Sequence, residues 1–306
     1  MTKVITIFLN PAVDNTLWVT ESVNKEPLCV LREESYAGGK GINLSKTLDS
    51  VGYPNLALGV VGKQNENTFL PLLKNSVKNF KFLYHDGKTR ENTTLIFPDG
   101  NILKVNHKGN LGNNVLPDFK KELLSVSKTA EFIAFCGRMP EGIKKEDYID
   151  LILSLKNKKV LIDTSSFTAS DYKRIKPFAI KPNQKELSDI VGKNLETEED
   201  VIKAAESLLP YCQNILVSMG ENGAVLVNNE GKFKAVPPKV KVLSDIGAGD
   251  ATAAGFIYSK AQNLNDLETI KTAVAFGSAA VQTEGTDIVK KEKIDETLKK
   301  VEAFKI

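Results

Sequence analysis

The sequence predicts an α/β protein with a doubly wound, mostly parallel sheet, helices on both faces and a small β-sheet lid. Short apolar runs alternate with helical patterns through most of the chain, and this alternation is typical of parallel sheets that are covered on both sides. Two segments, residues 11–37 and 88–108, are extended and β-rich and carry no helical pattern. We therefore expect a single domain over residues 1–306, with a lid built from these two insertions.

The expected elements are short and follow each other in strand–helix order. Ligands of open α/β sheets bind outside the carboxyl ends of the strands, so an acid or a glycine turn just after a strand carries the most weight. Strands are predicted at residues 4–9, 56–61, 81–85, 131–135, 159–163 and 214–218. Helices are predicted at residues 42–51, 66–76, 118–128, 146–156, 198–209 and 267–282.

Composition excludes several classes of protein. The 41 Lys and Arg and 38 Asp and Glu residues are interspersed and leave a net charge of +3, so no basic face for nucleic acid is expected. No apolar run approaches the roughly 18 residues of a membrane span, and the first residues read as a strand rather than a signal peptide. Three cysteines, an odd number, fit free thiols in a reducing cytoplasm. Two histidines are too few for a histidine-based metal cluster.

The motif GAGD at residues 247–250 precedes a run of small and apolar residues with helical spacing. A glycine-rich turn before a helix can point several backbone N–H groups at one place, and the helix N-terminus adds about half a positive charge. Such a site suits a phosphate or a phosphoryl group in transfer. Asp250 beside it fits a base that deprotonates the attacking hydroxyl. The alternative is an ordinary glycine turn with Asp250 in the first helical turn.

A second glycine motif, GGKGIN at residues 38–43, precedes a helix expected to begin near Ile42. Lys40 brings a positive charge into this loop, which suits a phosphate or a closely bound sugar; a structural turn is the alternative.

Two nucleotide-binding motifs are absent from the sequence, and their absence narrows the class of enzyme. The chain has no GxxxxGK[ST] motif of a P-loop enzyme and no GxGxxG motif after its first strand, so a dinucleotide-dependent oxidoreductase is disfavoured.

Six short motifs, in this order along the chain, resemble those of the PfkB (ribokinase-like) family of sugar kinases. They are LNPAVD at 9–14, GGKGIN at 38–43, TREN at 89–92, KPNQKE at 181–186, VSMGENGA at 217–224 and GAGD at 247–250. The resemblance extends over essentially the whole chain and implies a ribokinase-like fold that uses ATP and Mg²⁺. The first and third motifs are similar to those of the branch that phosphorylates sugar phosphates.

The resemblance implies a role for each matching residue. Asp250 would be the general base, and the turn formed by Gly247, Ala248 and Gly249 would hold the phosphoryl group in transfer. Asp14 would accept hydrogen bonds from sugar hydroxyls, unless it forms an Asx turn after Pro11. The remaining sugar-phosphate contacts would come from Gly38, Gly39, Lys40, Asn43, Arg90 and Asn92. Arg90 suits bidentate phosphate binding, and its alternative is a solvated arginine on an edge strand.

On the nucleotide side the resemblance implies an ATP site at the end of one strand. Its residues would be Ser218, Gly220, Glu221, Asn222, Gly223, Gly249 and the loop at Pro238. Asn183 and Glu186 would position Mg²⁺ through water, or else form a polar pair at a helix start. Lys185 would reach the nucleotide phosphates or be solvated. The small residues at 273–281 are expected mainly to permit close helix packing.

Two positions depart from the branch pattern. Cys29 stands where the branch often has a lid arginine, and Arg138 stands where the cleft loop usually has a serine. We infer that a phosphate-binding arginine is exchanged between the two places, so that Arg138 contacts the sugar phosphate; a salt bridge from Arg138 to Glu141 is the alternative. A further departure, KVNHKGN at 104–110, leaves the sugar open.

The predicted function is ATP-dependent phosphorylation of a ketohexose phosphate. Fructose 1-phosphate ranks first as the substrate, followed by tagatose 6-phosphate and fructose 6-phosphate. A non-catalytic sugar-phosphate sensor on the same fold is a more distant alternative, which the intact GAGD and NxxE motifs disfavour. The lid has potential edge strands, which are commonly covered, and we expect a cytoplasmic homodimer that pairs through the lids, with no nucleic-acid or membrane partner.

Overall fold

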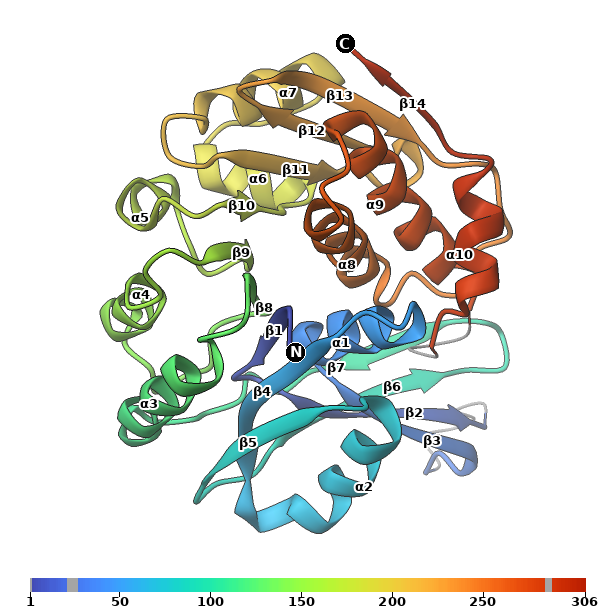
Figure 1. The fold of residues 1–306 in the computed structure, drawn as a ribbon. Helices are drawn as coiled ribbons and strands as arrows, with labels where there is room; N and C mark the ends of the chain where they lie inside the picture. The colour runs from blue at the N-terminus through green and yellow to red at the C-terminus, as the bar shows by residue number, and fades with distance from the viewer. Residues whose placement is uncertain (1, 21–26, 284–287) are drawn as a thin grey trace.

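The computed structural model describes residues 2–20, 27–283 and 288–306. Its centre is a 10-stranded sheet in the order β14-β13-β12-β11-β10-β9-β8-β1-β4-β5 (Figure 1). From one edge to the other, the strands are β14 (Glu302–Lys305), β13 (Gly231–Val236), β12 (Ala224–Asn228), β11 (Asn214–Ser218), β10 (Ala179–Ile180), β9 (Lys159–Asp163), β8 (Phe132–Cys136), β1 (Val4–Phe8), β4 (Asn55–Gly62) and β5 (Phe80–His85).

The sheet is parallel from β5 to β11 and antiparallel from β11 to β14. The parallel part brings the carboxyl ends of β1, β8, β9 and β11 to one edge of the sheet, and this is the edge at which the site lies.

Helices cover both faces of the large sheet (Figure 1). One face packs against α3 (Leu116–Val126), α4 (Lys145–Leu153), α5 (Ala169–Ile175), α6 (Gln184–Val191) and α7 (Glu198–Ser207). The other face packs against α1 (Lys40–Ser50), α8 (Ala248–Ala261), α9 (Asp266–Ala280) and α10 (Lys291–Leu298), with α2 (Glu66–Ser76) beside α1. Three short 3-10 helices complete the described elements: η1 (Lys63–Asn65), η2 (Asn113–Val115) and η3 (Gly220–Asn222).

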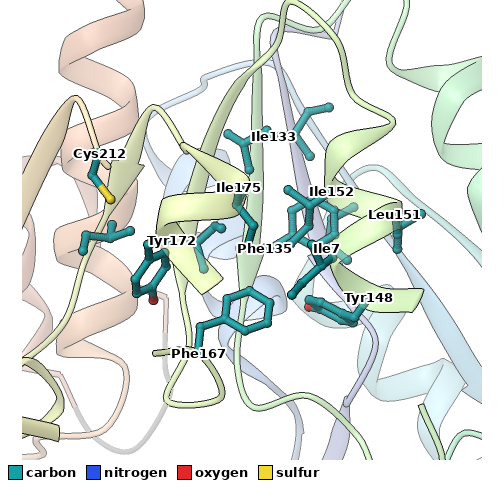
Figure 2. Packing of buried hydrophobic residues seen from close by; sticks show 14 of the residues in the cluster. Ile7, Ile133, Phe135, Tyr148, Leu151, Ile152, Phe167, Tyr172, Ile175 and Cys212 are labelled. Atoms are coloured by element: carbon teal, nitrogen blue, oxygen red, sulfur yellow. The ribbon is translucent and has the colours of Figure 1, made fainter. Parts of the chain in front are cut away.

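Alternation along the strands divides the core in two. On β1, Val4 packs on the α8–α9 side, whereas Ile5 and Ile7 pack on the α3–α7 side, as expected for side chains that alternate between the faces of a strand. Figure 2 shows part of the cluster on the α3–α7 side, in which Phe135 of β8 packs against Tyr148 of α4, with ring centroids 5.8 Å apart. Each residue of this layer is buried, so the two layers fix the sheet between them.

A separate 4-stranded sheet has the order β3-β2-β6-β7. Its strands are β2 (Ala12–Val19), β3 (Val30–Gly38), β6 (Arg90–Ile96) and β7 (Ile102–Val105). The pairing of β2 with β6 is parallel and sets Asp14 opposite Asn92, while β2 and β3 pair antiparallel with Asp14 opposite Tyr36. Residues 21–26 of the first predicted insertion lie outside the described residues.

The predicted fold class is confirmed, and helix α2 has the predicted bounds. Helix α1 begins at Lys40 rather than near Ile42, because Gly39 is its N-cap. The antiparallel strands β12, β13 and β14 were not predicted, and neither were the short helices α5 and α6. None of the helices in the described residues is both long and apolar enough to span a membrane.

Candidate active site

Asp250 lies in the first turn of α8, and its side chain is buried, with 7% of the residue exposed. Its Oδ2 accepts a hydrogen bond of 2.8 Å from Asn43 Nδ2, so the two glycine motifs meet at this carboxylate. Burial raises the pKa of Asp250 to about 6, although Lys40 and the Asn43 hydrogen bond act in the opposite direction. A carboxylate of this pKa is largely ionised at neutral pH and is still basic enough to accept a proton.

The backbone before Asp250 forms the predicted glycine turn. Gly247 is the N-cap of α8 with φ 81°, a left-handed conformation that favours glycine. Among the described residues, the N–H groups of Gly249 and Asp250 have no hydrogen-bond partner, whereas Ala248 N lies 3.5 Å from Asp245 O, at the limit of hydrogen bonding. The turn therefore presents two free donors and one weakly engaged donor at a helix N-terminus, as an anion site requires.

A buried ion network lies beside this turn. Lys40 Nζ is 2.8 Å from Asp163 Oδ1, and Lys181 Nζ is 3.2 Å from Asp163 Oδ2. Burial alone would raise the pKa of Asp163, but the two lysines outweigh it and hold that pKa below its ordinary value. Burial likewise acts to lower the pKa of Lys40, and the charges of Asp163 and Asp250 raise it overall. Asp163, Lys40 and Asp250 are therefore charged together at neutral pH.

Lys181 also reaches the glycine turn. A Cβ placed on Gly249 would lie 3.4 Å from Lys181 Nζ, so this ammonium group is next to the free N–H groups of the turn. Asp163 is the last residue of β9, and Lys181 directly follows the adjacent strand β10. Parallel strands place these two side chains at the same edge of the sheet, in an arrangement suited to a phosphate.

The residues predicted to bind the sugar are connected by a chain of hydrogen bonds in and beside the small sheet. Asn92 Nδ2 donates to Asp14 Oδ1 at 2.7 Å, and Arg90 Nη1 donates to His107 O at 2.9 Å and to Asn92 Oδ1 at 3.3 Å. Arg90 Nε also donates to Asn10 O at 3.4 Å. Asp14 is thus part of strand β2 and is oriented by Asn92, rather than forming an Asx turn.

Gly38 is required beside Asp14, because a Cβ at residue 38 would overlap the Asp14 carboxylate. The next residue, Gly39, has φ 121° and a hypothetical Cβ there would lie 3.3 Å from Pro11 Cα. The glycine pair therefore lets α1 begin directly against the sugar-side carboxylate. Lys40 follows, but its side chain is directed to Asp163 rather than to Asp14.

Arg138 is exposed in the loop after β8 and has no ion pair among the described residues. Glu141, the alternative partner, is paired with Lys108 at 3.1 Å instead. In the lid, Cys29 is exposed, and Arg32 pairs with Glu34 and stacks on Trp18 at 4.3 Å from the ring centroid. Arg138 is therefore free to bind an anion, whereas Arg32 already has partners within the chain.

The nucleotide-side residues follow β11. Ser218 ends this strand and its N–H donates to Pro182 O at 3.1 Å, which places it beside Asn183. The predicted residues Gly220, Glu221 and Asn222 form η3, and Gly223 follows as its C-cap. A Cβ at Gly223 would lie 3.0 Å from Pro237 Cδ, so the turn and the loop that contains Pro238 are adjacent.

Asn183 and Glu186 form a capping box at the start of α6. Glu186 N donates to Asn183 Oδ1 at 2.8 Å, and Asn183 N donates to Glu186 Oε2 at 2.9 Å. The helix-start alternative is therefore present, and it leaves Glu186 Oε1 available, 4.0 Å from Lys40 Nζ. Lys185 is exposed and has no ion pair among the described residues.

A magnesium ion fits this site only with help from other ligands. Within the part of the chain that the structure describes, no three His, Cys, Asp or Glu residues gather into a group that could hold a metal ion. Glu186 Oε1 and the Asn183 amide lie at the edge of the site, and Mg²⁺ usually keeps several waters and binds substrate phosphates besides one or two carboxylates. The residues therefore suit Mg²⁺ that arrives with a nucleotide.

Comparison with known proteins gives the family. Residues 5–293 match the model of the pfkB family of carbohydrate kinases. The chain belongs to this family. The kinase is 31% identical to 1-phosphofructokinase of Haemophilus influenzae over 312 residues, covering 99% of this chain and 98% of the relative. It is 27% identical to tagatose-6-phosphate kinase of Staphylococcus epidermidis, covering 99% of this chain and all (100%) of that protein.

The fold of the kinase agrees with this family. It is similar to phosphofructokinase-2 from Escherichia coli in complex with fructose 6-phosphate, with a TM-score of 0.89 and 25% identity, covering 98% of this chain and 99% of that chain.

Two residues beside the candidate site, Asp163 and Lys181, were not selected from the sequence. Asp163 ends the predicted strand at 159–163. Because ligands bind at the carboxyl ends of strands in such sheets, an acid at this position could have been selected as a site residue. Lys181 begins the motif KPNQKE, but no role was assigned to it. The small residues of α9 pack closely as expected, because a Cβ at Gly277 would overlap Thr252 of α8.

Proposed function

We propose that this protein is an ATP-dependent kinase of a ketohexose phosphate, and that fructose 1-phosphate is its preferred substrate. The observation that carries the proposal is Asp250: a buried carboxylate with a raised pKa, hydrogen-bonded to Asn43, next to free N–H groups of a helix N-terminus. Sequence similarity to 1-phosphofructokinases over nearly the full length supports the choice of sugar.

In the proposed reaction, Asp250 takes the proton of a sugar hydroxyl. The hydroxyl oxygen forms a bond to the γ-phosphorus of ATP, the bond from that phosphorus to the β–γ bridging oxygen breaks, and ADP leaves. The N–H groups of Gly249 and Asp250 donate hydrogen bonds to the phosphoryl oxygens as charge develops there. Lys181 and Lys40 add positive charge, and Asp163 keeps both ammonium groups in place.

The sugar is held between the small sheet and the large one. Asp14, oriented by Asn92, accepts hydrogen bonds from sugar hydroxyls, and Arg90 and Arg138 bind the phosphate that the sugar already carries. Closure of the small sheet over the cleft as a lid would exclude water and limit hydrolysis of ATP. Bound with the nucleotide, Mg²⁺ would neutralise phosphate charge near Asn183 and Glu186.

The test is ADP release with ATP and Mg²⁺ in a coupled assay. We expect kcat/KM to be highest with fructose 1-phosphate, compared with tagatose 6-phosphate, fructose 6-phosphate and unphosphorylated fructose. A higher kcat/KM with tagatose 6-phosphate would assign the second substrate, which the similarity to a tagatose-6-phosphate kinase favours. Absence of ADP release with every sugar would refute the kinase proposal and support a sugar-phosphate sensor.

We also propose that the protein forms a homodimer through the small sheet. Large apolar side chains are exposed on or beside its edge strands β3 and β7: Leu28, Val30, Leu31, Ile102, Leu103 and Val105. Pairing of two lids would cover these edges and side chains. Leu31 is 67% exposed, so Leu31→Glu should shift the sedimentation coefficient towards that of a monomer, while Leu153→Glu on α4, also exposed, should not.

A further inference from the structure

A cavity of about 610 Å³ lies outside the sugar side of the cleft. It is formed by the turn after β5 and by the segment that follows β7, here called the 107–112 segment. Both histidines of the chain line it, His85 and His107. This volume is sufficient for a metabolite-sized ligand.

The acids that line the cavity are already neutralised. Asp86 pairs with Lys63 at 2.7 Å, and Glu141 pairs with Lys108 at 3.1 Å. The lining residue Lys88 is exposed and has no ion pair among the described residues. The cavity therefore has positive charge that no carboxylate of the described chain balances.

A further side chain that lines this cavity can donate a hydrogen bond to an anion. His85 accepts a hydrogen bond of 3.1 Å from Gly87 N at Nδ1, and burial lowers its pKa, so the neutral ring carries its proton on Nε2 and can donate it. Arg90 also lines the cavity, and its hydrogen bonds within the described residues go to two backbone carbonyls and to Asn92 rather than to a carboxylate.

The 107–112 segment lines this cavity and is hydrogen-bonded to the predicted sugar contacts. His107 N donates to Asn92 Oδ1 at 3.1 Å, and Asn92 in turn donates to Asp14 Oδ1 at 2.7 Å. Arg90 is the residue that the cavity shares with the predicted sugar contacts; the other residues predicted there, such as Asp14 and Arg138, do not line the cavity. The cavity is therefore next to the predicted sugar contacts and is joined to them by Arg90 and by one hydrogen-bonded segment.

We propose that this cavity is a second anion site, which binds a phosphate-bearing small molecule through Lys88 and the two histidines. Binding there acts on the His107 backbone and so on the position of Asn92 and Asp14. Occupancy of the site therefore changes the KM for the sugar. This coupling rests on the proposed kinase function, whereas the existence of the anion site does not depend on it.

The histidines provide a specific probe, because they are the two histidines of the whole chain. Full-length protein with ¹³C-labelled histidine gives one Cε1–Hε1 cross-peak for each ring. We expect inorganic phosphate, added at constant ionic strength, to move both cross-peaks to saturation, while the same series of chloride concentrations does not. Lys88→Ser should weaken phosphate binding about tenfold, because a charge-assisted hydrogen bond is lost. Lys173→Ser on α5, a matched exposed lysine, should leave it unchanged.

Kinetics test the coupling and the separation from the sugar site. Without added phosphate, Lys88→Ser should keep the KM of the unmodified protein, and it should abolish the change in KM that phosphate causes. Arg138→Ser should retain the phosphate-induced shifts of the histidines. Glycerol 3-phosphate in parallel distinguishes a phosphate ester from free phosphate as the tighter ligand.

Several results would overturn the inference. Shifts that chloride reproduces would mean that no phosphate site exists. Loss of the shifts in Arg138→Ser, together with a raised KM in Lys88→Ser without phosphate, would mean that the cavity is part of the sugar site. Because the spectra need no turnover, a protein that binds phosphate here but never releases ADP would refute the kinase proposal and leave the anion site standing.

Discussion

Replacing Asp250 by asparagine tests the chemistry most directly. The substitution removes the proposed base but keeps the size of the side chain, and the new amide oxygen can still accept the hydrogen bond from Asn43. A positioned general base contributes about 10²- to 10⁴-fold to a rate, which corresponds to about 3–5 kcal/mol of barrier. We therefore expect kcat in Asp250→Asn to fall by several powers of ten in the coupled ADP assay, with the circular dichroism spectrum unchanged.

The pH profile of the unmodified protein gives an independent reading of the same carboxylate. With a pKa of about 6, Asp250 is protonated below that pH and ionised above it. The kcat/KM for the sugar should therefore rise about tenfold per pH unit below pH 6 and become level above pH 7. A profile that is flat between pH 5 and 8 would contradict the assignment, as would near-normal turnover of Asp250→Asn.

The raised pKa also has a cost in stability. The pKa of Asp250 is 3.8 in its ordinary state and about 6 in the folded protein, so the folded state binds the proton more tightly. The stabilisation of the folded state by this proton binding is fully present below about pH 4, and it is lost as the pH rises through 6. At about 1.4 kcal/mol per pKa unit, the ionised carboxylate costs about 3 kcal/mol at pH 7. Asp250→Asn should therefore raise the free energy of unfolding by up to this amount at pH 7 and leave it nearly unchanged at pH 4. Urea unfolding at the two pH values measures this difference, and an equal effect at both would refute the reasoning.

Three further substitutions test the rest of the site. Arg138→Ser should raise the KM for the phosphosugar at least about tenfold with kcat nearly unchanged, because an ion-paired phosphate contact is lost; an unchanged KM would exclude Arg138 from the sugar site. Gly38→Ala should raise the KM for the sugar and leave that for ATP unchanged, since the new methyl group displaces the Asp14 carboxylate. Lys181→Met should lower kcat and reduce the free energy of unfolding by about 3 kcal/mol, because a buried charge loses one of its partners; wild-type stability would show that Asp163 does not depend on Lys181.

Much of the large sheet was predictable because its parallel strands are buried on both faces and read as short apolar runs. Strand β9, for example, has the predicted bounds 159–163. The antiparallel strands β13 and β14 escaped prediction because they lie towards a sheet edge and mix lysines with apolar residues, as in the sequence of β13, GKFKAV. Helix α6 escaped because it is short and its first residues belong to a motif that was interpreted only for its chemistry.

The site was predicted in its local parts and missed in its long-range ones. Asp250, Asn43 and the glycine turn are recognisable from contiguous motifs, and they come together as the motifs imply. The ion network is different, because Lys40 and Asp163 are 123 positions apart in sequence. No local sequence pattern indicates that Lys40 and Asp163 are close in space, because their contact depends on the order of the strands in the sheet.

The ion network explains how Asp250 can be both buried and reactive. Burial raises its pKa and Asp163 adds to that effect, whereas Lys40 and Lys181 lower it, so that the pKa is about 6. With Asp250 ionised, the two carboxylates and the two ammonium groups sum to zero charge. In the proposed reaction, when Asp250 accepts the proton of the sugar hydroxyl, the charge of the group rises by one unit at the moment when the phosphoryl oxygens beside it are most negative. The proton transfer that activates the nucleophile thereby also increases the electrostatic stabilisation of the group in transfer, and this coupling requires Asp163 to hold two lysines rather than one.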